Sequence, residues 1–151
     1  MRSAYRVLAG LISLGVLVQA MAIALGWFTA LKDVDDGLVI DKNYEGNFGH
    51  SLHGTIGMMV IPILAILLLI VSFFAHVPGG VKWAAIVFGL VVLQIALAFV
   101  AFGAAPAVGA LHGANALVLL GVSGLAARRA SGPPTPATTG TTTGTTTEAT
   151  I

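Results

Sequence analysis

The stretch that decides the fold runs from His50 to Phe74, HSLHGTIGMMVIPILAILLLIVSFF, and contains no aspartate, glutamate, lysine or arginine. At a rise of about 1.5 Å per residue, a helix of this length crosses a hydrocarbon core of roughly 30 Å. A helix on the surface of a soluble protein keeps a polar face, and this stretch has none. It therefore predicts a membrane-spanning helix.

Three more apolar segments of similar length accompany it, at residues 7–31, 81–103 and 106–127. The links between the second and third spans and between the third and fourth are short, and short links make neighbouring helices antiparallel. The sequence thus predicts an all-α fold, an up-down bundle of four transmembrane helices within residues 1–130. Residues 131–151 are rich in threonine, glycine and proline, and we expect this tail to be disordered.

The composition of the 151-residue chain agrees with a membrane location, because 57% of its residues are hydrophobic and only 9% are charged. Soluble domains carry about 25% charged residues, so a soluble enzyme is excluded. The chain has no cysteine and therefore no disulfide, thiolate metal site or iron–sulfur cluster. No basic patch supports nucleic-acid binding. The expected partners are the lipid bilayer and a membrane redox partner or complex.

The charged residues predict the orientation in the cell membrane. Loop residues 32–49 hold five acidic residues and two lysines, whereas the other basic residues of the predicted bundle share the opposite side: Arg2, Arg6, Lys82, Arg128 and Arg129. By the positive-inside rule, both termini face the cytoplasm. A glycosylated extracellular tail would invert this topology, but Arg128 and Arg129 argue against it. Cleavage of the first span as a signal peptide near Ala20-Met21-Ala22 is an alternative that the continued apolarity to Phe28 disfavours.

An internal repeat relates the two halves of the chain. Ser51-Leu52-His53-Gly54 matches Ala110-Leu111-His112-Gly113, and Val16-Leu17-Val18-Gln19-Ala20 is close to Val91-Val92-Leu93-Gln94-Ile95. Each half therefore has a glutamine span followed by a histidine span. This pattern predicts a duplicated helical hairpin with an axis along the membrane normal.

The two repeated histidines are the main candidates for chemistry inside the membrane. His53 and His112 lie on the second and fourth spans, which are parallel and diagonal in such a bundle, at depths that differ by about 5 Å. Gly57 and Gly109 place small residues beside them. Two neutral imidazoles on opposite faces of a porphyrin can ligate iron, so one reading is a b-type haem between His53 and His112. The other reading is that both histidines only pack between helices.

The remaining polar residues of the spans have a structural interpretation. Gln19, Gln94 and Asn115 lie deeper, and Gln94 and Asn115 fall at a similar depth, which predicts an interhelical hydrogen bond.

The other histidines lie outside this interpretation. His50 is expected at the interface, with a His-x-x-His metal pair to His53 as an alternative, and His76 is expected in a loop. A porphyrin's propionates would point to the outer surface, within reach of His50, Lys32, Lys42 or Tyr44.

These residues carry a resemblance to known families. With Leu111-His112-Gly113-Ala114-Asn115-Ala116, His53 and Gln94, residues 7–129 resemble an uncharacterised family of small four-span membrane proteins of actinobacterial type. More distantly, the chain is similar to one half of haem A synthase and to small cytochrome b proteins. That likeness implies that His53 and His112 are axial haem ligands. Haem A synthase has two such units and an acidic residue near its ligand, and no span here contains a carboxylate.

The expected function is therefore haem binding for electron transfer or haem handling, with a non-enzymatic accessory or scaffolding subunit as the alternative. The spans contain no catalytic carboxylate pair and no serine–histidine–acid set, and whether the protein is an enzyme stays open.

Overall fold

The computed structural model describes residues 1–132, so the segment at 133–151, for which disorder is predicted, lies outside the described residues. The described chain is helical and has no β-strand. Its elements are α1 (Arg2–Asp35), α2 (Phe48–Thr55), the π-helix η1 (Ile56–Val60), α3 (Ile61–Ser72), α4 (Gly80–Gly103), the 3₁₀-helix η2 (Pro106–Val108) and α5 (Gly109–Arg129). The predicted all-α fold is confirmed.

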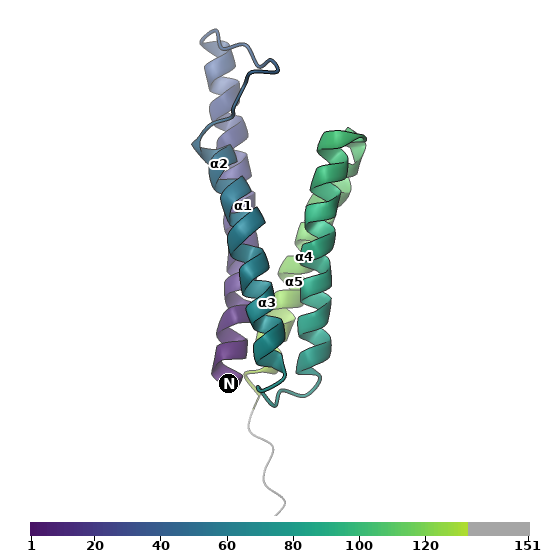
Figure 1. Ribbon diagram of the computed structural model, residues 1–151. Coiled ribbons are helices and arrows are strands. Elements are labelled where there is room, and N and C mark those ends of the chain that lie inside the picture. The colour runs from purple at the N-terminus through teal and green to yellow at the C-terminus, as the bar shows by residue number, and fades with distance from the viewer. Residues whose placement is uncertain (133–151) are drawn as a thin grey trace, which may run out of the picture.

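Four of these helical stretches are long and apolar enough to cross a membrane, with α2, η1 and α3 forming one continuous second span, Phe48–Ser72. Helix α1 differs most from the expected span, because it continues beyond Leu31 to Asp35. The polar residues there end the apolar span but not the helix, and Lys32 pairs with Asp36 one turn later, 2.6 Å apart. Helix α1 therefore rises above the other helices in Figure 1.

The four spans form an up-down bundle in which each span packs on two others. Helix α1 packs on α2, α3 and α5, and α4 packs on α3 and α5. The second span and α5 are therefore diagonal, as are α1 and α4. We call α1 with the second span the first hairpin and α4 with α5 the second hairpin (Figure 1).

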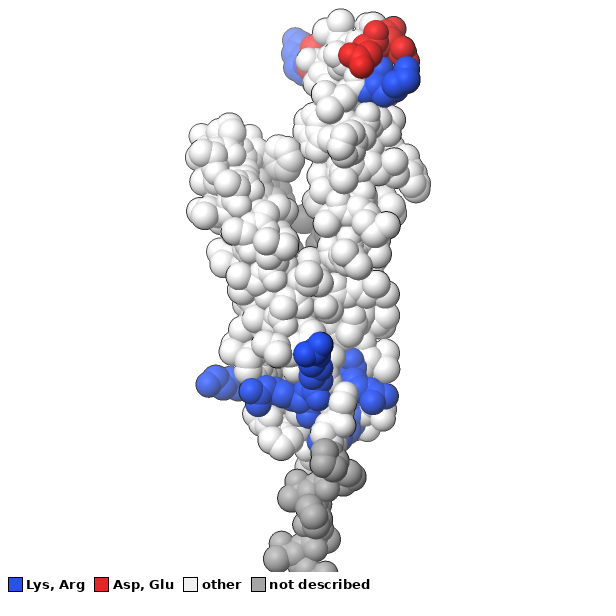
Figure 2. All heavy atoms as spheres, turned by 180° about the vertical axis from the view of Figure 1, so that it is seen from behind, with Lys and Arg blue, Asp and Glu red and all other residues white. Residues whose placement is uncertain are grey.

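The hairpins pack tightly at the end that holds the N-terminus and separate toward the other end (Figures 1 and 2). Tyr5, Ile12, Leu68, Val87 and Leu119 are buried in the tight half. Polar contacts add to this packing: the Tyr5 hydroxyl donates to the Gly80 carbonyl at 3.0 Å, and the Ser13 hydroxyl donates to the Leu120 carbonyl at 3.1 Å. The buried side chains and these two hydrogen bonds therefore hold the two hairpins together in this half of the bundle.

The outward faces of the helices are apolar. Large exposed side chains occur on every span, among them Leu17, Ile63, Phe99 and Leu117. Several small and polar residues lie inside instead, including Gln19, Ser72, Asn115 and Ser123. A helix surface of this kind matches lipid tails rather than water. The fold is that of a multi-pass membrane protein.

The second span widens into a π-helix one turn before its proline. Pro62 has no N–H, and its ring would collide with the carbonyl four residues earlier. The backbone at η1 adopts wider hydrogen bonding, in which the Ile61 N–H donates to the Ile56 carbonyl five residues before it. Single π-turns of this kind are frequent at functional sites. Here the π-turn begins three residues after His53.

Candidate functional site

His53 lies on the last turn of α2 and points to α1. Its Nδ1 lies 3.1 Å from the backbone carbonyl oxygen of Gln19. A carbonyl oxygen only accepts hydrogen bonds, so Nδ1 carries the proton and donates it. In the neutral ring Nε2 then keeps its lone pair, and this atom makes no hydrogen bond to another residue of the described chain.

His112 repeats this arrangement in the second hairpin. It lies on the first turn of α5, and its Nδ1 lies 3.0 Å from the backbone carbonyl oxygen of Gln94 on α4. The same argument assigns the proton to Nδ1 and a free lone pair to Nε2. The predicted repeat of glutamine and histidine is thus a repeated hydrogen bond from a histidine ring to a glutamine backbone.

The two histidines meet across the bundle. Their ring centroids are 6.3 Å apart and their planes are inclined by 60°. Both side chains are half-buried, one in each hairpin, and His112 lies one turn from the start of α5, toward the end at which the hairpins stand apart (Figure 1). The bundle therefore brings together, from diagonal helices, the two residues that the sequence predicted as ligands.

Gln94 and Asn115 form a network behind His112. The Asn115 amide donates to the Gln94 Oε1 at 2.6 Å and to the Leu90 carbonyl at 3.0 Å, and Gln94 Nε2 donates to the His112 carbonyl at 2.9 Å. The expected hydrogen bond between Gln94 and Asn115 is present. The network ties α5 to α4 at the level of His112.

Gln19 has the equivalent place in the first hairpin but lacks such a partner. It is 8% exposed, and its Oε1 is buried with no hydrogen-bond partner among the described residues. The residue three positions after His53 is Ile56, whereas the residue three positions after His112 is Asn115. The two halves are therefore alike in their histidines and unlike in the polar groups behind them.

The two glycines predicted to make room beside the histidines lie against helix neighbours. A Cβ on Gly57 would come within 2.7 Å of Gln19 Nε2, so Gly57 makes space for that amide. A Cβ on Gly109 would lie 3.8 Å from Ala101 Cβ on α4. In the described chain both glycines serve contacts inside a hairpin.

His50 fixes the start of α2. Its Nδ1 accepts a hydrogen bond from the Asn47 N–H at 3.4 Å, while Asn47 Oδ1 accepts from the N–H groups of Gly49 and His50. Its ring also contacts the Trp27 ring edge to face at 5.1 Å. This reciprocal cap was missed in the sequence, although Asn-x-x-His has the spacing of a capping box.

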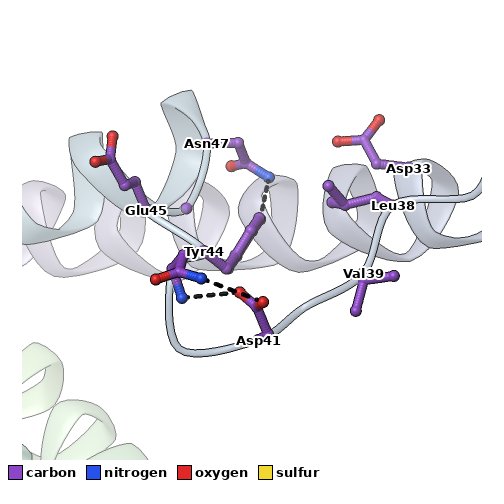
Figure 3. A pocket seen from close by; sticks show the side chains of 9 residues that line it. Asp33, Leu38, Val39, Asp41, Tyr44, Glu45 and Asn47 are labelled. Carbon is purple, nitrogen blue, oxygen red and sulfur yellow. Dashed lines mark hydrogen bonds between the residues drawn. The ribbon is translucent and has the colours of Figure 1, made fainter.

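The acidic loop forms a shallow hollow at the tip of the first hairpin (Figure 3). The hollow encloses about 440 Å³, and its polar lining includes Asp33, Asp41, Tyr44, Glu45 and Asn47. Asp41 accepts hydrogen bonds from the backbone and side-chain amides of Asn43. Within residues 1–132 no cluster of three or more histidine, aspartate or glutamate side chains could hold a metal ion. The loop is a solvated polar surface.

His76 and Lys32 stand apart from the candidate site. His76 lies in the loop before α4, as its position before Pro78 predicted, and is exposed. Lys32 pairs with Asp36 and lies 13 residues, about 20 Å, along α1 from Gln19.

No protein family, curated protein or solved structure matches the chain.

Proposed function

We propose that this membrane protein binds one b-type haem, with His53 and His112 as its two axial ligands. The observation that carries the proposal is the pair of imidazoles from diagonal helices with ring centroids 6.3 Å apart. Imidazoles that bind one metal from opposite sides, with bonds of about 2 Å and ring centres about 1 Å beyond the nitrogens, have centroids roughly 6 Å apart. The spacing supports a single iron between them.

The hydrogen bonds at Nδ1 support the same proposal. Histidines that bind metals almost always donate the other ring N–H to a carbonyl or carboxylate, which fixes the tautomer and the orientation of the ring. The Gln19 and Gln94 carbonyls have this role toward His53 and His112. Both Nε2 atoms are then the ones available to a ligand.

The surroundings suit an apolar cofactor. The spans offer aliphatic and aromatic side chains with no carboxylate. Lys32 is not part of the proposed site, because it pairs with Asp36 and lies about 20 Å along α1 from Gln19.

A haem held by two histidines supplies a one-electron redox centre when bound. The contribution of the chain is to orient both imidazoles through their hydrogen bonds at Nδ1 and to fix the distance between the hairpins. The proposed activity is therefore electron transfer within the membrane, or haem handling. The resemblance to one half of haem A synthase agrees with haem binding, and the lack of a carboxylate in the spans argues against oxidation of the haem.

We further propose that both termini face the cytoplasm. The bundle has a basic end, which holds the N-terminus and the end of α5, and an acidic tip at the opposite end (Figure 2). The positive-inside rule places the basic end in the cytoplasm of a plasma membrane. The histidine pair then lies in the outer half of the bilayer.

The alternative function is an accessory or scaffolding subunit in which the histidines only pack. The hydrogen bonds to Gln19 and Gln94 favour it as much as haem binding, because they would also hold helices together in a protein without a cofactor. An absorption spectrum separates the two functions.

The experiment is a reduced-minus-oxidised spectrum of the protein purified in detergent from haem-replete cells. We expect a low-spin b-type spectrum that is lost in His53→Ala and in His112→Ala. His76→Ala, an equal change at an exposed loop residue, is the matched control and should keep the spectrum. A colourless wild type would support the packing role instead.

A further inference from the structure

The end of the bundle that carries the N-terminus is strongly basic. It holds Arg2, Arg6, Lys82, Arg128 and Arg129, which form a band around this end (Figure 2). In residues 1–132 every aspartate and glutamate lies between Asp33 and Glu45, at the opposite end. These five cations therefore have no carboxylate near them in the described chain.

Two of the five have other partners. The Arg129 guanidinium lies 4.6 Å from the centre of the Trp83 ring, and Arg2 Nε donates to the Ala130 carbonyl at 3.2 Å. Arg128 is exposed and makes no hydrogen bond or ion pair with the rest of residues 1–132. Its charge is available to an anion from outside the described chain.

Arg128 also lines a groove on α5. The groove encloses about 340 Å³, and its other lining residues are Leu120, Gly121, Gly124 and Leu125. It is hollow because the two glycines present no side chain, and a Cβ on Gly121 would meet no atom within 4 Å. Arg128 follows Gly121 and Gly124 at helical spacings of seven and four residues, so it lies on the same face, at the end of the groove.

A second cation lies close to this level on α1. Ser13 faces α5, since its hydroxyl donates to the Leu120 carbonyl, and Arg6 lies two turns earlier on the same side of α1. Helix α5 is antiparallel to α1, so a shift of seven residues from Leu120 reaches Ala127, next to Arg128. Helical geometry thus places Arg6 of α1 at about the level of Arg128, beside the helix that forms the groove.

We propose that this groove binds one anionic phospholipid, with an acyl chain over Gly121 and Gly124 and the phosphate at Arg128 and Arg6. The apolar length of the groove lies within the span and its basic end at the membrane surface, which is the arrangement of a phospholipid in its leaflet. Basic pockets beside transmembrane helices at the cytoplasmic surface bind acidic headgroups in this way. The charge of the groove therefore selects an anionic lipid over a zwitterionic one.

The test is native mass spectrometry of the delipidated full chain titrated with phosphatidylglycerol or phosphatidylcholine. We expect one phosphatidylglycerol to bind in preference, and Arg128→Gln to weaken it about fivefold, since each basic side chain near an anionic surface contributes on that order. Gly121→Leu fills the groove and should weaken it as well. Lys82→Gln removes an equal charge at the same end and should have little effect.

Two results would overturn the proposal. Equal binding of the two lipids would show that the basic end does not select an anion. An equal loss in Lys82→Gln and Arg128→Gln would show that attraction is spread over the basic end and not placed in the groove. Arg128 is exposed, so its variant keeps the fold and the test stays decisive if Gly121→Leu folds poorly.

Discussion

At the scale of single residues, the two hairpins differ in how they satisfy a buried amide. The Gln94 side chain donates to the His112 carbonyl and accepts from Asn115, whereas Gln19 Oε1 has no partner in the described chain. A buried polar group without a hydrogen bond costs about 1–3 kcal/mol. The buried amide of the second hairpin is therefore the better hydrogen-bonded of the two. The part of α5 that carries His112 is tied to α4 by these side-chain hydrogen bonds.

Asn115→Leu tests that network. Leucine keeps a similar volume but leaves Gln94 Oε1 without its donor and removes the second hydrogen bond to the Leu90 carbonyl, so we expect a loss of about 1–3 kcal/mol in the free energy of unfolding. The measurement is unfolding in mixed detergent micelles followed by circular dichroism. Val118→Leu, a substitution on the lipid-facing side of the same helix, should change stability little. An unchanged stability in Asn115→Leu would contradict the role given to the network.

Gly57→Ala tests the close approach of Gln19 to the second span. The new methyl group would come within 2.7 Å of Gln19 Nε2, the far end of a flexible side chain, which must move aside. We therefore expect Gly57→Ala to be less stable than Gly113→Ala by about 1 kcal/mol, the low end of the cost of overpacking. Gly113→Ala is the matched control, because a Cβ there meets no atom within 4 Å. It should be neutral or stabilise α5, since alanine is the better helix former. Equal melting temperatures of both variants would refute the proposed contact.

The residues of the site could be predicted from the repeat, but their hydrogen bonds could not. The repeat pointed to His53 and His112 and to the glutamine on each preceding span, because identical local sequences fold alike. The bonds from the rings go to the glutamine backbones, which every residue possesses and which no side-chain pattern marks. Gln19 Oε1 has no donor in the described chain because Ile56, at the position equivalent to Asn115, cannot donate a hydrogen bond. That this oxygen is buried shows only once the helices are packed.

At the scale of the elements, the start of α2 is fixed by a cap and by a close helix contact. The Asn47 side chain caps α2 and donates to the Gly26 carbonyl of α1 at 2.7 Å. Gly49 lies so near the backbone of Gly26 that a Cβ would collide with it. These contacts set the height of α2 on α1, and with it the level of His53.

Asn47→Ala should therefore shift the first hairpin. We expect a loss of about 1–2 kcal/mol, the range for a lost N-cap, together with a change in Trp27 fluorescence, because His50 packs on Trp27 and belongs to the cap. Asn43→Ala is the control in the same loop, since its side chain bonds only to Asp41. A Trp27 spectrum that is the same in wild type and in Asn47→Ala would show that the cap does not position α2.

The number and direction of the helices were predictable because membrane spans are set by length and apolarity. Two features of the elements were not. Helix α1 runs on past its apolar part, since helix formation does not stop where hydrophobicity does. The π-turn at Ile56–Val60 was not anticipated, because Pro62 only requires that the helix adjust and does not specify how.

At the scale of the whole molecule, the protein is a bundle that is closed at its basic end and open toward the acidic tip (Figures 1 and 2). The closed half holds the buried aromatic and aliphatic core, and the candidate site lies in the other half, near the start of α5. The charge distribution follows the same axis, basic at the closed end and acidic at the tip. Packing density, charge and the position of the candidate site therefore all follow the long axis of the bundle.

The proposed orientation can be measured directly because the chain has no cysteine of its own. Single cysteines introduced as Asn43→Cys at the acidic tip and Ser131→Cys at the basic end are both exposed. In intact cells, a maleimide that cannot cross membranes should label Asn43→Cys, and it should label Ser131→Cys only after permeabilisation. The reverse pattern would place the histidine pair in the inner half of the bilayer.

The most direct test of the central claim is a titration of the apoprotein in detergent with haem, followed at the Soret band. We expect a low-spin, six-coordinate spectrum that saturates at about one haem per chain, as two histidine ligands require. The double variant His53→Ala, His112→Ala should show only the spectrum of haem in detergent. A wild-type titration that cannot be distinguished from that of the double variant would contradict the account.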